Sequence, residues 1–146
     1  MNHRVLLILL LFLATGLPAQ TTAAPSAPPA AYQPKFKGDK ANSQAEFTTL
    51  AYMRTVATSE RLYYRKYHRY ADSLRALVGS GSFTRRMADP DRGDYRVSYR
   101  GQQDSYALTL VPRQFDSAHR SFFLDQTGEF RVSETTSANE KSPPLK

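Results

Sequence analysis

The sequence contains no cysteine and no tryptophan, and only three of its 146 residues are histidine. Without cysteine the chain has no disulfide framework and no leader cysteine to lipidate. His3, His68 and His119 are scattered, so cysteine and histidine together offer no zinc site. Folding must therefore depend on an ordinary hydrophobic core.

Long apolar runs are also lacking, apart from residues 5–14 near the N-terminus. This run is shorter than the roughly 20 apolar residues that span a bilayer. It follows a short basic start and precedes the small-residue stretch "TGLPAQ", which is the order of a secretory signal peptide. We therefore expect residues 1–19 to be a cleaved signal peptide and the mature protein to be periplasmic or secreted. No transmembrane segment is expected after leader removal.

Charge is not concentrated in any one run, although 20 basic residues exceed 13 acidic ones and give a formal net charge of +7. Such a charge favours solubility and loose attraction to anionic polymers. Its spread along the chain argues against a dedicated polyanion-binding tail. A phosphate-cradling glycine loop is missing, and Ser117 and His119 do not suffice for a catalytic triad. We expect a protein that is not an enzyme.

Two stretches show neither a helical nor a strand period. Residues 20–43 are rich in Ala, Pro and Thr, and residues 134–146 are polar. Each has too little apolar surface to offset the entropy of ordering it. We therefore predict a Pro/Ala-rich flexible linker at 20–43, a folded domain at 44–133 and a flexible polar tail at 134–146.

Helical periodicity predicts one long helix from about Ser43 to Tyr67. Ser43 followed three residues later by Glu46 indicates a capping box at its start. On the helical wheel the tyrosines and the arginines of this segment fall on opposite sides. A short helical turn follows, with Val78 on its buried side and Gly79 as its end. The predicted core comprises Val56, Glu60, Tyr63, Tyr67, Tyr70, Leu74 and Leu77.

After the glycines at 79 and 81 the apolar period changes from 3.6 to 2. The segment "YRVSYR" reads as a half-buried strand, and "SYALTLV" places Tyr106, Leu108 and Leu110 on one face. The segments "RSFFL" and "EFRVS" complete the predicted strands. Pro112 should end the second strand because it lacks a donor, and Gly128 suits the last turn. Short turns between strands imply an antiparallel meander. We predict an α+β fold in which the long N-terminal helix packs on a three- to four-stranded antiparallel sheet.

This order of parts resembles the globular region of type IV pilins and of the major pseudopilin of type II secretion. The resemblance covers residues 45–146 and includes the strings "LAYMRTVATSERLYYRKYHRYADSLRAL", "GDYRVSY", "SFFLDQTGEFR" and "SPPLK". It implies a structural or interaction module, accessory to a type IV pilus or type II secretion system, with protein partners in that apparatus. A Pro/Ala linker stands where that family has its apolar anchor half-helix. We therefore expect a stand-alone domain.

Glu60 is a candidate functional residue because it falls on the apolar face of the predicted helix. A buried carboxylate must be paired or hydrogen-bonded. It could serve as a general acid or base, or as a structural group held by a tyrosine hydroxyl, a loop N–H or an arginine. We favour the structural interpretation, since no second catalytic group stands at a recognisable spacing.

The loop "ADPDRGDY" places Asp89, Asp91 and Asp94 close together, which raises a calcium site as an alternative to a simple turn. The loop does not fit an EF-hand, because neither glycine nor glutamate stands at the required position. The turn is the favoured interpretation, and no other cofactor is indicated. Arg92, Gly93 and Asp94 also form the tripeptide of cell adhesion, which recurs by chance.

An exposed row of basic residues gives the alternative function, an envelope module that binds DNA or polysaccharide. Arg61, Arg65 and Arg69 recur every four residues, and Arg54 continues the row. Such a row binds nucleic acid with steep salt dependence. The outer strand positions Arg96, Arg100 and Arg131 could extend the basic surface. A solvated helix face is the simpler interpretation.

Overall fold

The fold is described from a computed structural model, which places residues 32–146. The predicted signal peptide and residues 20–31 of the predicted linker lie outside the described residues. Within residues 32–146, no helix is both long enough and apolar enough to cross a membrane.

The α-helix α1 spans Gln44–Tyr67, and both of its ends follow local signals. Ser43 is the N-cap, and its hydroxyl accepts the N–H of Glu46 at 3.1 Å, which satisfies one of the first-turn donors. At the other end His68 adopts the left-handed conformation, with φ 54°, and donates its N–H to the Tyr64 carbonyl at 2.8 Å. This conformation commonly terminates helices. The predicted long helix is confirmed.

The strands form one antiparallel meander in chain order, as predicted, but the sheet has five strands and not three or four. The additional strand is β1, in the "ADPDRGDY" loop, where Gly93 at φ 70° turns the chain back into β2. A strand of two residues is too short to produce a period of 2, so the sequence pattern did not reveal it. The strands are β1 (Asp91–Arg92), β2 (Tyr95–Gly101), β3 (Tyr106–Pro112), β4 (Ser121–Asp125) and β5 (Arg131–Ser133).

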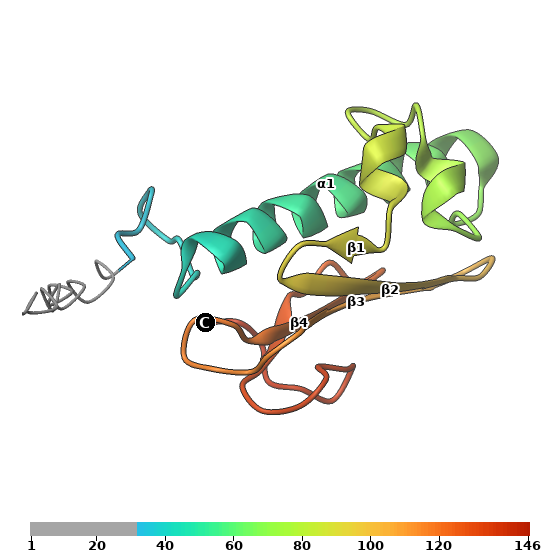
Figure 1. Ribbon diagram of the computed structural model, residues 1–146. Coiled ribbons are helices and arrows are strands. Elements are labelled where there is room, and N and C mark those ends of the chain that lie inside the picture. Colours follow the sequence, from blue (N-terminus) through green and yellow to red (C-terminus); the bar gives the residue numbers. More distant parts are fainter. Residues whose placement is uncertain (1–31) are drawn as a thin grey trace, which may run out of the picture.

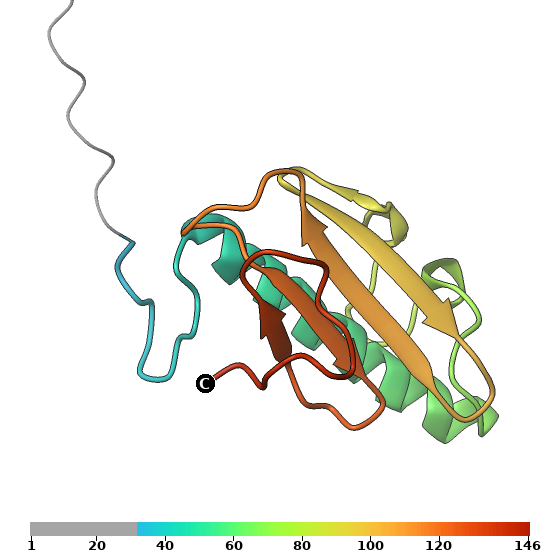
Figure 2. The ribbon, with the colours of Figure 1, turned by 90° about the horizontal axis from the view of Figure 1, so that it is seen from below.

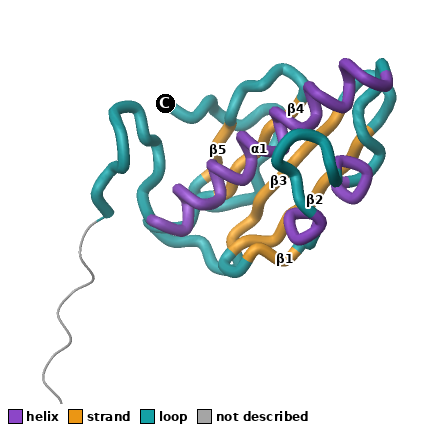
Figure 3. The backbone as a smooth tube through the Cα atoms, turned by 90° about the horizontal axis from the view of Figure 1, so that it is seen from above, coloured by secondary structure: helices purple, strands orange, loops and turns teal. Residues whose placement is uncertain are grey.

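Helix α1 lies across one face of the sheet (Figures 1 and 3). The register pairs Val97 with Leu110 and Leu110 with Phe122, which forms an apolar row across the strands beneath the helix. Burial of each such side chain contributes about 1.5–3 kcal/mol. The helix covers this row with the buried side chains of Leu50, Met53 and Val56.

The predicted core is correct for most residues and wrong at the end of α1. Tyr67 is 47% exposed, because the chain reverses at His68 and no element covers the ring. Tyr70 is only partly buried. Val78, also expected to be buried, is 39% exposed: it follows a 3₁₀ turn, whose period of three residues does not bring it onto the buried side. The buried members are Val56, Glu60, Tyr63, Leu74 and Leu77.

Along the chain, two short 3₁₀ helices follow α1 and precede the first strand. The first, η1 (Leu74–Leu77), begins at Ser73, whose hydroxyl accepts the N–H of Ala76 at 3.3 Å. The second, η2 (Arg85–Ala88), leads into β1.

Residues 134–146, predicted to be a flexible polar tail, instead lie against the edge strand β5. The N–H of Val132 donates to the Pro143 carbonyl at 3.0 Å. The N–H of Leu145 donates to the Phe130 carbonyl at 2.8 Å. Backbone hydrogen bonds hold this segment, so its polar composition gave no sign of the order.

The same segment also covers the face of the sheet that is turned away from α1 (Figure 2). Ala138 is 2% exposed and donates its N–H to the Ser121 hydroxyl at 2.9 Å. That hydroxyl in turn donates to the Leu110 carbonyl at 3.0 Å. Phe123, which points to this outer face, is buried as well. Ser121 therefore joins β3, β4 and the C-terminal segment.

The end of the predicted linker, residues 32–43, is also ordered around the carboxylate of Asp39. The Tyr32 hydroxyl donates to Asp39 at 2.5 Å, and the backbone N–H groups of Lys35 and Ala41 donate at 2.9 and 3.0 Å. Ala41 is buried against the core. The folded domain thus extends beyond both predicted boundaries, 44 and 133.

Replacing Ser121 with alanine should loosen the C-terminal segment. The buried N–H of Ala138 would lose its acceptor, which costs about 1–3 kcal/mol. We expect a lower midpoint of thermal unfolding and faster amide hydrogen exchange across residues 134–146. Ser133→Ala is the control, since that hydroxyl bonds only the hydroxyl and the N–H of the exposed Thr136 and should alter exchange at that residue alone. Equal exchange in the two variants would contradict this role of Ser121.

Candidate functional site

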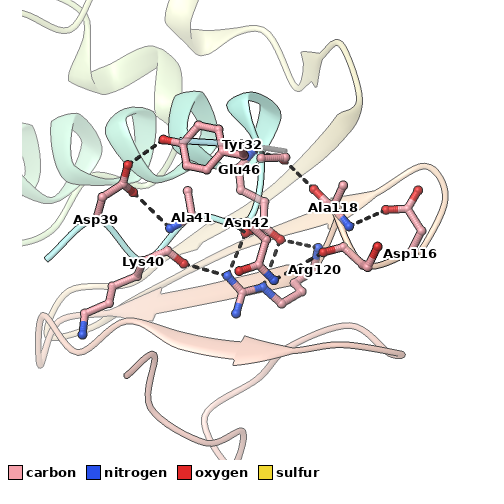
Figure 4. A network of polar contacts seen from close by, with 11 residues as sticks. Tyr32, Asp39, Lys40, Ala41, Asn42, Glu46, Asp116, Ala118 and Arg120 are labelled. Atoms are coloured by element: carbon pink, nitrogen blue, oxygen red, sulfur yellow. Dashed lines mark hydrogen bonds and ion pairs between the residues drawn. The ribbon is translucent and has the colours of Figure 1, made fainter. Parts of the chain in front are cut away.

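The first buried carboxylate, Glu46, lies in the first turn of α1 and has no exposed surface. Arg120, from the loop before β4, approaches both of its oxygens: Nε lies 3.0 Å from Oε1 and Nη2 lies 2.7 Å from Oε2. The backbone N–H groups of Arg120 and Asn42 add bonds of 2.9 and 2.7 Å (Figure 4). Such forked, charge-assisted contacts are among the stronger hydrogen bonds in proteins.

Further bonds extend this contact into the surrounding backbone. Arg120 Nη2 also donates to the Lys40 carbonyl at 2.7 Å, and the Ser43 hydroxyl donates to the Ala118 carbonyl at 2.5 Å. The hydrogen bonds that Arg120 donates to the Glu46 carboxylate raise the pKa of Arg120. The hydroxyl half of the predicted capping box is present, but the Glu46 carboxylate accepts the N–H of Asn42 and not that of the N-cap.

The second buried carboxylate, Glu60, lies further along the same face of α1. Its Oε2 accepts the N–H of Ala71 at 3.2 Å, and its Oε1 is hydrogen-bonded to the Tyr99 hydroxyl. The Tyr99 hydroxyl also lies 2.8 Å from the Ala71 carbonyl oxygen. Gly101 permits this approach, since a Cβ there would lie 1.6 Å from that oxygen. These contacts match the favoured interpretation of Glu60 as a structural group.

The oxygen–oxygen contacts around Tyr99 favour the protonated, neutral form of Glu60. Burial raises the pKa of Glu60, although the hydrogen bonds from Tyr99 and Ala71 act in the opposite direction. Tyr99 has one hydroxyl hydrogen but two oxygen neighbours. When Glu60 is protonated, its O–H donates to Tyr99 and the Tyr99 O–H donates to the Ala71 carbonyl. Only this arrangement places a hydrogen in each oxygen–oxygen contact.

The predicted calcium ligands line an open groove of about 770 Å³ between α1 and the β1–β2 hairpin, but they do not converge. Asp89 accepts the N–H of Asp91 at 2.9 Å, and Asp91 forms an ion pair with Arg113 at 2.6 Å. Asp94 lies 3.9 Å from His119. Within residues 32–146, no three acidic or histidine side chains are arranged to hold a metal ion. The carboxylates of Asp89 and Asp91 instead accept backbone N–H groups two residues on, as in turns.

The adhesion-like tripeptide is not displayed as a unit. The guanidinium of Arg92 lies 4.6 Å from the centre of the Tyr52 ring and donates to the Arg86 carbonyl at 3.4 Å. The side chain is therefore folded back against α1, away from the exposed Asp94.

His119 is held by a carboxylate and not by the neighbouring serine. Its Nδ1 lies 2.8 Å from Asp116 Oδ1. Among the described residues, no hydrogen bond joins the Ser117 hydroxyl to this ring. The pair Ser117 and His119 therefore does not form a nucleophile and its base.

Arg54, Arg61 and Arg65 of the predicted row lie exposed on α1, whereas Arg69, also exposed, lies beyond the end of the helix at Tyr67. Arg61 donates to the Thr58 hydroxyl at 3.1 Å, and Arg54 lies 5.9 Å from the centre of the Phe130 ring. Within the described part of the chain, the arginines in ion pairs are Arg113, Arg120 and Arg131. The row, which we call the Arg row, consists of Arg54, Arg61, Arg65 and Arg69.

The strand arginines do not extend the Arg row, because they lie on the opposite side of the molecule. Tyr95 and Val97 of β2 are buried beneath α1. Side chains alternate along a strand, so Arg96 and Arg100 point away from the helix. Arg131 is occupied by Glu129 and by the Ser142 carbonyl. The two basic surfaces are separate.

At the C-terminal end of α1, tyrosines lie beside arginines. The helical wheel had predicted that the two kinds of residue are on opposite sides. Tyr64 is 37% exposed, and Tyr70 folds back so that the two ring centres lie 4.7 Å apart. They border a shallow groove of about 370 Å³, here called the Tyr–Arg groove. It is lined by Thr58, Arg61, Leu62, Tyr64, Arg65 and Tyr70.

The helical wheel missed this groove because it treated Tyr70 as a continuation of the helix. It also could not identify Arg120 or Tyr99 as partners of the buried carboxylates. The hydrogen bond between the Arg120 backbone and Glu46 joins residues 74 positions apart, and no local pattern signals such a pair. The Ser43 and Glu46 spacing was the one available indication that Glu46 is constrained.

Arg120 should contribute far more to stability than an exposed arginine in a similar ion pair. Arg120→Met would leave a buried charge without its partner, which typically costs 3–5 kcal/mol. Arg113→Met is the control, because its 2.6 Å pair with Asp91 has side chains 49% and 60% exposed and should cost at most about 1 kcal/mol. Urea denaturation of both variants measures the difference. Similar losses would show that the Glu46–Arg120 pair is not a principal anchor.

Glu60→Gln should remove a pH dependence from folding. Because the folded pKa of Glu60 exceeds its ordinary value of 4.5, its stabilising contribution is complete below that value and is lost as pH rises through the folded pKa. The glutamine amide can donate to Tyr99 and accept from Ala71 as the neutral acid does. We expect the variant to be at least as stable as the parent at neutral pH.

Urea denaturation from about pH 4 to pH 8 tests this, with unfolding free energy as the measurement. The slope assigned to Glu60 should vanish in Glu60→Gln and persist in Glu134→Gln, which changes an exposed carboxylate. A large loss of stability in Glu60→Gln at neutral pH would indicate that Glu60 is ionised in the folded protein.

Comparison with protein-family models, with curated proteins and with solved structures finds no match to this chain. The likeness to pilins therefore stays a prediction from the quoted residues. The α+β fold is described by the structure itself, and function has to be argued from the surfaces and buried groups above.

Proposed function

We propose that the chain is an exported, non-enzymatic, pilin-like module that acts by binding other proteins, as an accessory to a type IV pilus or a type II secretion system. The order of a long helix, an irregular link and an antiparallel meander supports the pilin-like assignment. The observation that carries the proposal is that both buried carboxyl groups are occupied by contacts within the domain. Glu46 and Glu60 are both bound by groups of the domain itself, so each has a structural task.

The outer face of β2 is the candidate surface for a protein partner. Arg96, Ser98 and Arg100 are exposed there and point away from α1. The C-terminal segment lies nearer to β4 and β5 on this side of the sheet (Figure 2). A partner can therefore contact β2 without displacing the helix or the C-terminal segment.

The proposal can be tested with the full chain expressed in cells that carry a pilus or type II secretion system. Mass spectrometry should find a mature N-terminus at Gln20. A photo-crosslinking residue at position 98 should capture a pilin or pseudopilin subunit, and Arg96→Ala with Arg100→Ala should weaken capture severalfold. Arg61→Ala with Arg65→Ala is the matched control, since it removes the same charge from the opposite face. An uncleaved chain, or capture unaffected by either pair, would contradict the proposal.

A second candidate function is polyanion binding through the Arg row. The observation that favours it is the exposure of these arginines together with the absence, within residues 32–146, of ion pairs to them. Binding of this kind weakens steeply as salt is added. The same double variants distinguish the two functions, because only Arg61→Ala with Arg65→Ala should reduce binding to heparin or DNA.

A further inference from the structure

The Tyr–Arg groove has a preformed aromatic floor. Tyr64 projects from α1, and Tyr70 comes from the link that follows it. The ring of Tyr70 is supported from behind by Tyr106, with 5.2 Å between ring centres. Its backbone N–H is fixed by the Gln103 carbonyl at 3.1 Å. One ring of the pair is thus held by the sheet while the other remains accessible.

Positively charged side chains lie beside the aromatic floor of the Tyr–Arg groove. Arg61 and Arg65 both line the groove. They are four residues apart on α1, so their Cβ atoms are about 5–6 Å from each other on one side of the helix. Lys66 and Arg69, at the same end of α1, are exposed as well. The surroundings are therefore complementary to a negatively charged chain.

We propose that the Tyr–Arg groove binds single-stranded nucleic acid, with a base stacked on Tyr64 and backbone phosphates contacting Arg61 and Arg65. The inference deepens the second candidate function and rests on it. Aromatic side chains next to a positively charged track are the usual means of binding single strands without sequence preference.

Other anionic partners use only part of this arrangement. In a duplex the faces of the bases are covered by their neighbours, so Tyr64 would have nothing to stack on. An acidic polysaccharide offers charges for the arginines but no aromatic bases. A membrane-binding face buries Trp, Phe or Leu, whereas the exposed aromatic residues at this end of α1 are the tyrosines Tyr64 and Tyr67.

Fluorescence anisotropy of the full chain with labelled oligothymidine, at low and at physiological salt, tests the inference. Unlabelled DNA duplex, heparin and phosphatidylserine vesicles serve as competitors. We expect oligothymidine to be bound more tightly than duplex. Tyr64→Ala should weaken binding about tenfold or more, whereas Tyr64→Phe, which keeps the ring, should bind within about twofold of the parent.

The charge contribution has its own matched pair of variants. Arg61→Ala with Arg65→Ala should weaken oligothymidine binding and reduce its salt dependence, and Arg96→Ala with Arg100→Ala should do neither. Circular dichroism confirms that each variant is folded. Tyr64 is 37% exposed and packs on Tyr70, so Tyr64→Ala should lower the midpoint of thermal unfolding modestly, and Tyr64→Phe should leave it nearly unchanged.

The remaining outcomes separate this inference from the function on which it rests. If heparin or duplex competes fully and Tyr64→Ala binds like the parent, the groove is a polyanion site without stacking, and this inference is overturned. If the protein binds none of the anionic probes, polyanion binding fails as well. Displacement of oligothymidine by the vesicles alone would assign the groove to a lipid surface and reject nucleic acid.

Discussion

A carboxylate that is removed from water must have partners, and at Glu46 this requirement organises one end of the domain. Arg120 is held in place by the two oxygens of Glu46 and by the Lys40 carbonyl. The loop before β4 is thereby fixed to the start of α1. Glu60, about four helical turns further along, makes the corresponding contact with Ala71 and Tyr99. A polar contact at each end sets the position of the helix along the sheet.

The apolar row between these contacts stabilises the domain but could not define this position alone. Packing of aliphatic and aromatic side chains tolerates shifts and substitutions of similar volume. A shift of α1, by contrast, would leave Glu46 or Glu60 without its buried hydrogen-bond partners, which is far more costly. We therefore assign the two carboxyl groups to the alignment of helix and sheet, and we look for function on the exposed residues, on the outer face of β2 and on the Arg row with Tyr64.

The helix and four of the strands could be predicted from the sequence because their signals are local. Ser43 and the period of 3.6 define α1, and alternation defines β2 and β3. What local patterns could not supply were the contacts of residues far apart in the chain. Arg120 carries no sign that it will meet Glu46. Tyr70 was placed on the wheel as if the helix continued, although His68 ends it and redirects the ring onto Tyr64.

The C-terminal segment also affects how the sheet can associate with other chains. An uncovered edge strand offers a row of backbone donors and acceptors on which another β-strand can assemble. Here the outer side of β5 is already bonded to residues 143–145. Pro143 and Pro144 have no N–H to offer a newcomer. At the other edge β1 is only two residues long. Strand-by-strand aggregation is therefore disfavoured at both edges of the sheet.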